Sequence, residues 1–271
     1  EVNPTESLQK GKMAKCVPMD CIDSFTRQIS RFEEKEFNGG MKFRNGDTLF
    51  ARITPCLENG KTAFVDFLNE NEVGFGSTEY IVIREKQGLS DKKFLYYLAI
   101  SSNFREIAIR AMTGTSGRQR VQTDVLINKT FLLPPLQEQK AIASILSAFD
   151  DKIELLREQN KTLEEIGQTI FHEWFGKYGV DDELPKGWRV GKLGEVGQIV
   201  CGKTPSKENP EYFCGDIPFI KIPDMHGEVF IVKTEDSLTE LGANTQKNKF
   251  IPKNSICISC IATVGLVSIT S

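Results

Sequence analysis

The sequence predicts an α+β protein in which two mixed α/β domains, built of short-stranded sheets plus helices, are separated by a long coiled-coil-forming helix. Three observations predict this class: a heptad pattern of apolar residues in the middle of the chain, an internal repeat on either side of it, and short alternating strands within that repeat. We therefore expect a first domain at residues 1–134, a spacer helix at 135–178 and a second domain at 179–271.

The spacer helix is predicted by an apolar residue every 3.5 positions, which describes a helix with a narrow stripe that pairs with another helix. At 1.5 Å per residue it would be about 60 Å long. Pro134 and Pro135 fit its start, and Gly176 and Gly179 fit its end. We expect pairing, with a second helix or a second copy of the chain, through eight residues: Ile142, Leu146, Phe149, Ile153, Leu156, Asn160, Leu163 and Ile170.

Asn160 is the polar member of this stripe. It fits a position that fixes the register of a helix pair. A tolerated polar residue near the middle of the helix is the alternative.

The repeat is carried by three anchors in the same order. Lys42–Ala51 aligns with Lys249–Ile258, Val17–Pro18 aligns with 222–223, and Gly60 aligns with Gly265. The offset stays between 205 and 207 residues. Because a chance match would not keep one offset across three anchors, a duplicated domain is the better explanation.

Local patterns predict the elements of the first copy. Apolar residues alternate over Thr48–Ile53, Thr62–Phe67 and Glu79–Arg84, which is typical of strands. Asp91–Met112 has a helical pattern whose apolar residues are expected in the core.

Composition indicates a globular protein, with 39% hydrophobic and 26% charged residues. No apolar run approaches the length of a membrane span. Seven cysteines without a framework spacing suggest reduced thiols in a cytoplasmic chain. The net charge of −3 is unfavourable for nucleic-acid binding. The acidic residues are concentrated in the helix tract, however, and the segment 103–122 contains four arginines and the single acid Glu106, so a local positive surface is possible.

Motifs that suggest catalysis have the wrong context. Gly197–Thr204 matches a phosphate-binding loop, but Pro205 follows where a helix must begin. Cys257 and Cys260 lie three apart in a β-branched run, where they point to opposite faces, and no second ligand pair is near. We expect no catalytic residue and no metal site.

The sequence resembles a known family, the specificity (S) subunit of type I restriction-modification systems. The resemblance is carried by the helix segment LPPLQEQKAIASILSAFDDKIELLREQNKTLEEIGQTIFHEWF, by the segment that begins LPKGWRVGKLGEVGQIVCGKTP, and by GMKFRNGDTLFARITPCLENGKTAF in the first domain. It covers essentially the whole chain.

The resemblance implies two target-recognition domains that read a bipartite site in double-stranded DNA. It implies a non-catalytic subunit that directs methyltransferase (M) subunits and restriction/translocase (R) subunits in a bacterial or archaeal cytoplasm. This chain would bind no cofactor, while S-adenosylmethionine, ATP and Mg would be held by the partner subunits.

The chain departs from the family in one respect. Members carry a second conserved helix that pairs antiparallel with the first, and none is found before Ser271, which corresponds to about Asp66 of the first copy. We therefore expect a chain trimmed at both ends. An unpaired stripe would then favour self-association through the long helix.

Candidate DNA contacts are residues whose chemistry suits phosphates or base edges. In the loop 113–120, glycines permit close approach, hydroxyls suit phosphate, and Arg and Gln can read guanine and adenine. The candidates are Thr115, Ser116, Arg118, Gln119 and Arg120, with Arg52 and Lys61 elsewhere in the first domain and Lys203 and Thr204 in the second. A solvated loop is the alternative.

Two other functions compete with this interpretation. The chain could be the recognition part of a larger fused restriction-modification enzyme. It could also be a coiled-coil spacer protein whose end domains bind proteins.

Overall fold

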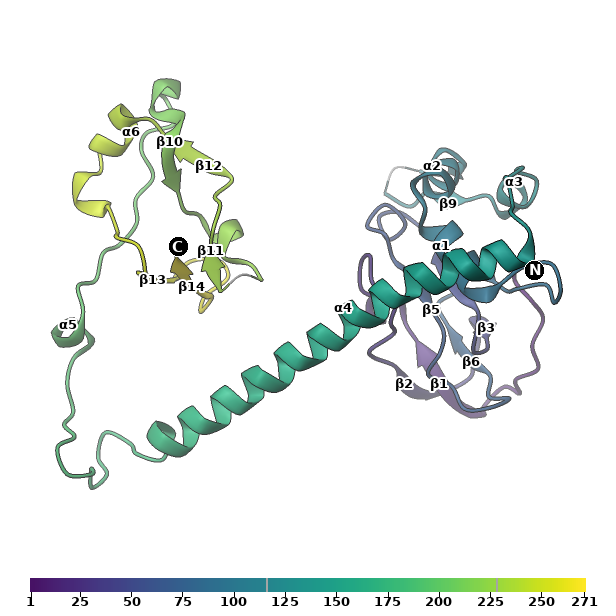
Figure 1. The fold of residues 1–271 in the computed structure, drawn as a ribbon, viewed down its shortest axis with the longest axis horizontal. Coiled ribbons are helices and arrows are strands. Elements are labelled where there is room, and N and C mark those ends of the chain that lie inside the picture. Colours follow the sequence, from purple (N-terminus) through teal and green to yellow (C-terminus); the bar gives the residue numbers. More distant parts are fainter. Residues whose placement is uncertain (116, 228) are drawn as a thin grey trace. The chain divides into compact units, whose positions relative to one another are not determined.

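The computed structural model describes residues 1–115, 117–227 and 229–271. The chain divides into two compact units, Glu1–Lys177 and Tyr178–Ser271. The long helix belongs to the first unit (Figure 1). Each unit is a mixture of short strands and helices, as the sequence predicts.

The first unit contains two main sheets and a small hairpin. The four-stranded sheet has the order β2 (Glu33–Glu36), β1 (Met13–Val17), β6 (Gly74–Gly76), β3 (Met41–Phe43). The three-stranded antiparallel sheet has the order β5 (Thr62–Phe64), β4 (Thr48–Ala51), β7 (Tyr80–Ile83), and β8 (Met112–Thr113) pairs with β9 (Arg120–Val121). A short 3-10 turn, η1 (Met19–Cys21), follows β1. The three strands expected from the sequence are confirmed, each shorter than the pattern suggested.

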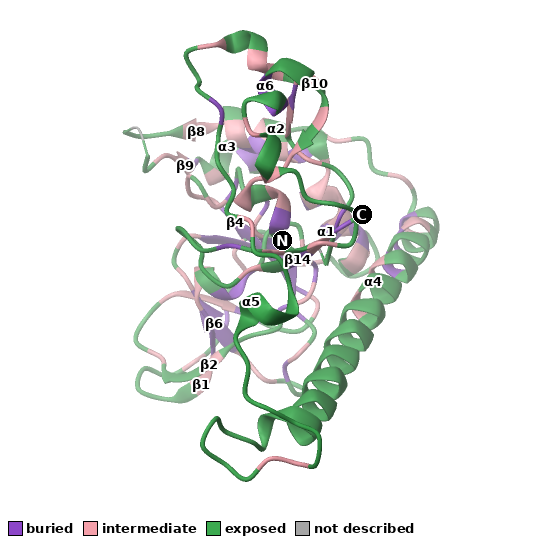
Figure 2. Ribbon diagram, turned by 90° about the vertical axis from the view of Figure 1, so that its left-hand side faces the viewer, coloured by how far each residue is buried: buried purple, intermediate pink, exposed green. Residues whose placement is uncertain are grey.

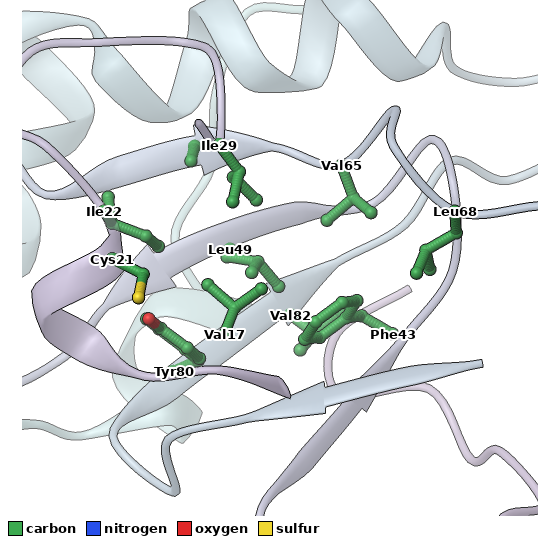
Figure 3. Packing of buried hydrophobic residues seen from close by; sticks show 11 residues of the cluster. Val17, Cys21, Ile22, Ile29, Phe43, Leu49, Val65, Leu68, Tyr80 and Val82 are labelled. Carbon is green, nitrogen blue, oxygen red and sulfur yellow. The ribbon is translucent and has the colours of Figure 1, made fainter. Parts of the chain in front are cut away.

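The centre of the first unit is β4, because both of its faces are buried. Leu49 pairs with Val82 and faces one core cluster, which includes Val17, Phe43 and Tyr80 (Figure 3). Its neighbour Phe50 faces the second cluster. Successive strand residues point to opposite faces, so a strand between two cores reads as a continuous apolar run.

The segment Asp91–Met112 forms two helices, α1 (Lys92–Ile100) and α2 (Ser102–Arg110), instead of one continuous piece. Asp91 caps the first helix by accepting a hydrogen bond from the Phe94 amide at 2.9 Å. Ser101 has extended backbone and caps the second helix through its hydroxyl, which accepts from the Phe104 amide at 3.3 Å. The break therefore has a local cause, and a further short helix, α3 (Thr123–Ile127), follows.

The long helix α4 runs over Leu136–Phe171 and ends in a π-helical turn, η2 (His172–Gly176). Pro135 stands at its N-cap. This confirms the predicted long helix. Near its start, α4 buries Gln139, Ala143 and Ser147 beside α1, while most of its length is exposed (Figure 2).

The second unit has two small sheets and short helices. The strand β10 (Phe213–Phe219) pairs with β12 (Asp236–Leu238), and the other sheet has the order β11 (Phe230–Ile231), β14 (Val267–Thr270), β13 (Ile256–Ile258). Helical segments are α5 (Leu193–Val196), η3 (Pro210–Tyr212), η4 (Ile222–Met225), α6 (Glu240–Asn244) and η5 (Lys247–Lys249).

The two units share a strand–turn–strand plan at the repeat anchors. The hairpin β4–β5 turns through Gly60 at φ +71, and the hairpin β13–β14 turns through Gly265 at φ +90. On the second strand of each hairpin, the Phe64 amide donates to the Arg27 carbonyl at 2.9 Å, and the Ile269 amide donates to the Val229 carbonyl at 2.7 Å. The structural correspondence supports the duplication read from the sequence.

The hairpins differ in burial. Leu49 and Phe50 are fully buried because β4 lies between β5 and β7 with α1 beside it. Ile256 and Ile258 of β13 are exposed, since β13 is an edge strand among the described residues of its sheet.

Candidate nucleic-acid interface

The predicted reading loop 113–120 projects from the β8–β9 hairpin. Its base is fixed by pairing of Thr113 with Arg120 and by the Gln122 side chain, which donates to the Thr113 hydroxyl at 2.5 Å. It also meets the β4–β5 loop, where the Thr54 amide donates to the Gln119 carbonyl at 3.0 Å. The base of the loop is thus anchored at two sides.

The tip of this loop is exposed. Thr115 and Arg118 point into solvent, and the Thr115 carbonyl accepts from the Arg118 amide at 3.0 Å. Gln119 is half-buried. Ser116 lies outside the described residues.

The two arginines of the loop have different surroundings. Arg120 donates to the Glu79 carboxylate through Nε at 2.9 Å and Nη2 at 2.7 Å, and this contact raises the pKa of Arg120. The Arg118 guanidinium has no partner among the residues that the structure describes. Arg118 can therefore reach a ligand directly, whereas Arg120 stiffens the loop and would have to leave Glu79 to read a base.

Arg52 and Lys61 both make contacts within the first unit. Arg52 is half-buried, and its Nη2 donates to the Val121 carbonyl at 3.0 Å. Lys61 donates from Nζ to the Met19 carbonyl at 2.9 Å. These contacts leave their positive charge unpaired by any carboxylate among the described residues, so each can still attract a phosphate at short range.

Lys203 and Thr204 lie in the second unit on irregular backbone, and both are exposed. Pro205 is buried directly after them, and the next helical segment begins at Pro210. A phosphate-binding loop needs amides at a helix N-terminus, and the local backbone does not form one.

The heptad stripe of α4 is exposed in a single chain. Side chains at six of its positions are between 38% and 65% exposed: Leu146, Phe149, Ile153, Leu156, Leu163 and Ile170. Ile142 is half-buried, and Asn160 is exposed. The stripe is therefore available for a partner helix.

A different face of α4 packs against the rest of the first unit. The Gln139 side chain accepts from the Asp91 amide at 3.0 Å and donates to the Leu89 carbonyl at 3.2 Å. Further along, the Tyr97 hydroxyl donates to Asp150 at 2.7 Å and Arg27 contacts Glu154. At 100° per residue, this face is roughly a quarter turn from the stripe.

Sequence reasoning missed these docking residues. Arg27 and Glu154 are 127 positions apart, and neither belongs to a motif. Glu79, the partner of Arg120, was also missed. A covarying pair of positions is the signal that could have revealed them.

No three His, Cys, Asp or Glu side chains gather as metal ligands in residues 1–115, 117–227 and 229–271. In the same part of the chain, no helix combines the length and apolar character that a membrane crossing needs.

A repeated α/β unit with an exposed basic loop, joined to a long helix with a free apolar stripe, defines a class of modular recognition protein. The chain belongs to the family of the type I restriction modification DNA specificity domain, which matches residues 21–165 and 185–271. The match covers both units.

Similar proteins carry the same description. The HindI specificity subunit of Haemophilus influenzae is 33% identical, with 90% of this chain and 67% of that protein covered. The EcoAI specificity subunit of Escherichia coli is 30% identical over 69% of this chain and 33% of its own length. The MjaIX specificity subunit of Methanocaldococcus jannaschii is 28% identical, with 60% of this chain and 40% of that protein covered. The chain thus spans about two thirds or less of these relatives.

Similar solved structures include the HsdS subunit from Thermoanaerobacter tengcongensis. It is 24% identical to this chain, with a TM-score of 0.44, and the match covers 96% of this chain and 66% of that one. A chain from a study of complex assembly in the type I R-M system is 21% identical, with a TM-score of 0.46 and the same coverage of both chains.

Proposed function

We propose that this chain reads a bipartite DNA target for a type I restriction-modification complex, without catalysing a reaction itself. It directs methyltransferase subunits and nuclease–translocase subunits to that target in the cytoplasm of a bacterium or archaeon. The observation that carries the proposal is the repeated unit: the hairpin that turns at Gly60 recurs at Gly265, and the family of DNA specificity domains matches both copies.

The first reader corresponds to residues 1–134. Its exposed loop offers Arg118, whose guanidinium can donate two parallel hydrogen bonds to guanine O6 and N7. The Arg120–Glu79 ion pair holds the loop base, which lowers the entropy lost when the loop meets DNA. Thr115 and Lys61 suit phosphate contacts that position the duplex without selecting a sequence.

The second reader corresponds to residues 179–271. Lys203 and Thr204 are exposed on irregular backbone, where an ammonium and a hydroxyl can reach a phosphate. These contacts would contribute affinity that falls with salt and not base selection.

The spacer, residues 135–178, contributes the α4 stripe as its pairing surface. Its exposed apolar side chains suit a second helix of the same kind, a helix of a methyltransferase subunit, or the stripe of a second copy. The face that carries Gln139 and Glu154 is already used for docking, so partner binding and domain docking do not compete for the same side chains.

The test is a methylation map. The chain is expressed with its methyltransferase partner in a host that lacks other adenine methylation, and modified adenines are located across the genome. We expect one bipartite sequence motif, which disappears when this chain is omitted. Methylation that persists without the chain, or that shows a single undivided motif, would contradict the proposal.

A further inference from the structure

Phe25 is an aromatic residue held in an unusual and exposed position. Its side chain is 68% exposed, and its backbone has φ +53, in the left-handed region. That conformation is uncommon for residues other than glycine, asparagine and aspartate, and it is strained where a bulky side chain adopts it. An exposed ring on such a backbone gains little from packing, so the surrounding contacts must hold it there.

Three contacts hold Phe25 in place, one through its backbone and two through its ring. The Phe25 amide donates to the Gly60 carbonyl at 3.1 Å. The ring edge lies over Gly60, where a Cβ atom would approach the Phe25 Cε1 to 2.5 Å. The Arg105 guanidinium lies over the ring, with Cζ 4.9 Å from the centroid.

Arg105 is itself fixed by the β4–β5 loop. Its Nη2 donates to the Leu57 carbonyl at 3.3 Å and to the Glu58 carbonyl at 3.0 Å. The same loop contacts the basic loop through the Thr54 amide and the Gln119 carbonyl. The Phe25–Arg105 pair and the loop 113–120 are therefore braced by opposite ends of one loop.

The charge around the ring favours an anionic partner. Arg105 stacks on the ring, and Lys61 follows Gly60 in the same loop. Glu58 is the exposed acid of the loop. Asp23, two residues before Phe25, is paired with Arg31 at 3.2 Å. An aromatic face joined to a guanidinium matches the alternation of sugar and phosphate along a DNA strand.

We propose that Phe25 and Arg105 form a second DNA-contact site of the first reader, beside the loop 113–120. The ring packs against a sugar on the surface of the duplex, and the guanidinium faces the adjacent phosphate. This inference rests on the proposed function and adds an apolar contact to it.

The test measures binding of the chain, in complex with its methyltransferase partner, to a duplex that carries the mapped target. Phe25→Ala is expected to weaken binding about tenfold, through loss of the apolar contact between the ring and the duplex, with an unchanged salt dependence. Arg105→Gln is expected to weaken binding and to reduce the slope of log K against log salt by about 0.9. Phe25→Trp should retain binding, because it keeps the aromatic face.

Phe32→Ala is the matched control. Phe32 is an exposed phenylalanine of the same unit, but it stacks on Phe67 at 5.0 Å, away from the β4–β5 loop contacts. It should bind DNA as the unmodified chain does. If Phe25→Ala lowers the melting temperature, the DNA affinities of Phe25→Trp and Phe25→Leu are compared instead. Both variants keep a large apolar side chain, but only Trp keeps the aromatic face, so weaker binding by Phe25→Leu shows that this face contributes to DNA binding.

Each outcome has one meaning. Equal binding by the unmodified chain, Phe25→Ala and Phe25→Leu overturns this inference and leaves the proposed function standing. Loss of methyltransferase capture in Phe25→Ala, with DNA affinity otherwise unchanged, overturns it in favour of a protein contact. Failure of the unmodified complex to bind its mapped target would defeat the proposed function itself.

Discussion

Arg27 donates hydrogen bonds to both carboxylate oxygens of Glu154, from Nε at 3.2 Å and from Nη2 at 2.7 Å. Its Nη2 also contacts Asp151 at 2.5 Å. Burial alone would lower the pKa of Arg27, but the hydrogen bonds with Glu154 and Asp151 raise it overall, so the guanidinium stays charged. Together with Gln139, this clasp joins α4 to the first reader at two points along the helix.

The clasp should contribute measurably to stability. Arg27 is only 8% exposed, so Arg27→Ala removes a charged donor and leaves Glu154 half-covered without a partner. We expect a loss of about 1–3 kcal/mol in the free energy of unfolding. Chemical denaturation followed by fluorescence measures it. Arg31→Ala, which breaks an exposed pair with Asp23, is the control and should change stability by about 0.5 kcal/mol or less.

Substitutions of the two loop arginines should have different effects on DNA binding. Arg118→Ala is expected to leave thermal stability unchanged, to weaken DNA binding by about 1–3 kcal/mol and to relax preference at one base pair. Arg120→Ala removes the partner of Glu79 and is expected to loosen the loop, so all sequences weaken together. Methylation maps and binding assays of both variants check this. Retained sequence preference in both would remove the loop from the reading surface.

The free stripe of α4 should drive association of a chain that has no partner helix. Exposed apolar stripes of this length are avoided in monomers, so we expect dimers at micromolar concentration in analytical ultracentrifugation. Leu163→Glu combined with Ile170→Glu should shift the chain to monomer. Thr162→Glu, at an exposed position outside the stripe, should leave association unchanged. A monomeric unmodified chain would contradict the prediction.

The loss of folding stability at acidic pH should depend in part on Glu72. A hydrogen bond from the Asn69 amide at 2.7 Å and the Lys15 ammonium at 3.1 Å lower the pKa of Glu72. Because the folded pKa lies below the unfolded one, this contribution is complete above the usual Glu pKa and is lost as pH falls through the folded value. We expect Glu72→Gln to be less stable at neutral pH and to lose less stability on acidification. Glu70→Gln, at an exposed neighbouring position, should behave as the unmodified chain does.

The length of α4 should set the number of unread base pairs. Deleting Asn160–Ile166, with the matching residues of the partner helix, shortens the helix by about 10.5 Å, which corresponds to about three base pairs. This segment lies beyond Glu154, so the clasp is preserved. The methylation map should show a shorter spacer with unchanged half-sites. An unchanged spacer with altered half-sites would refute the role of the helix as a ruler.

Elements whose cause is local could be predicted from the sequence. The heptad period predicted α4, short apolar patterns bounded by turn residues predicted β4, β5 and β7, and the nearly constant repeat offset predicted that the turn at Gly60 would recur at Gly265. Each of these follows from periodicity or from backbone preference, and both are properties of neighbouring residues.

Which side chains are available for a ligand depends on tertiary packing. Arg118 and Arg120 look equivalent in the sequence, but Glu79 occupies the second and leaves the first exposed. Likewise, Arg27 meets Glu154, and Phe25 meets Arg105, across separations that no local pattern records. Ion pairs and stacked contacts form where the fold brings distant residues within a few ångströms, so their partners depend on packing and not on sequence neighbours.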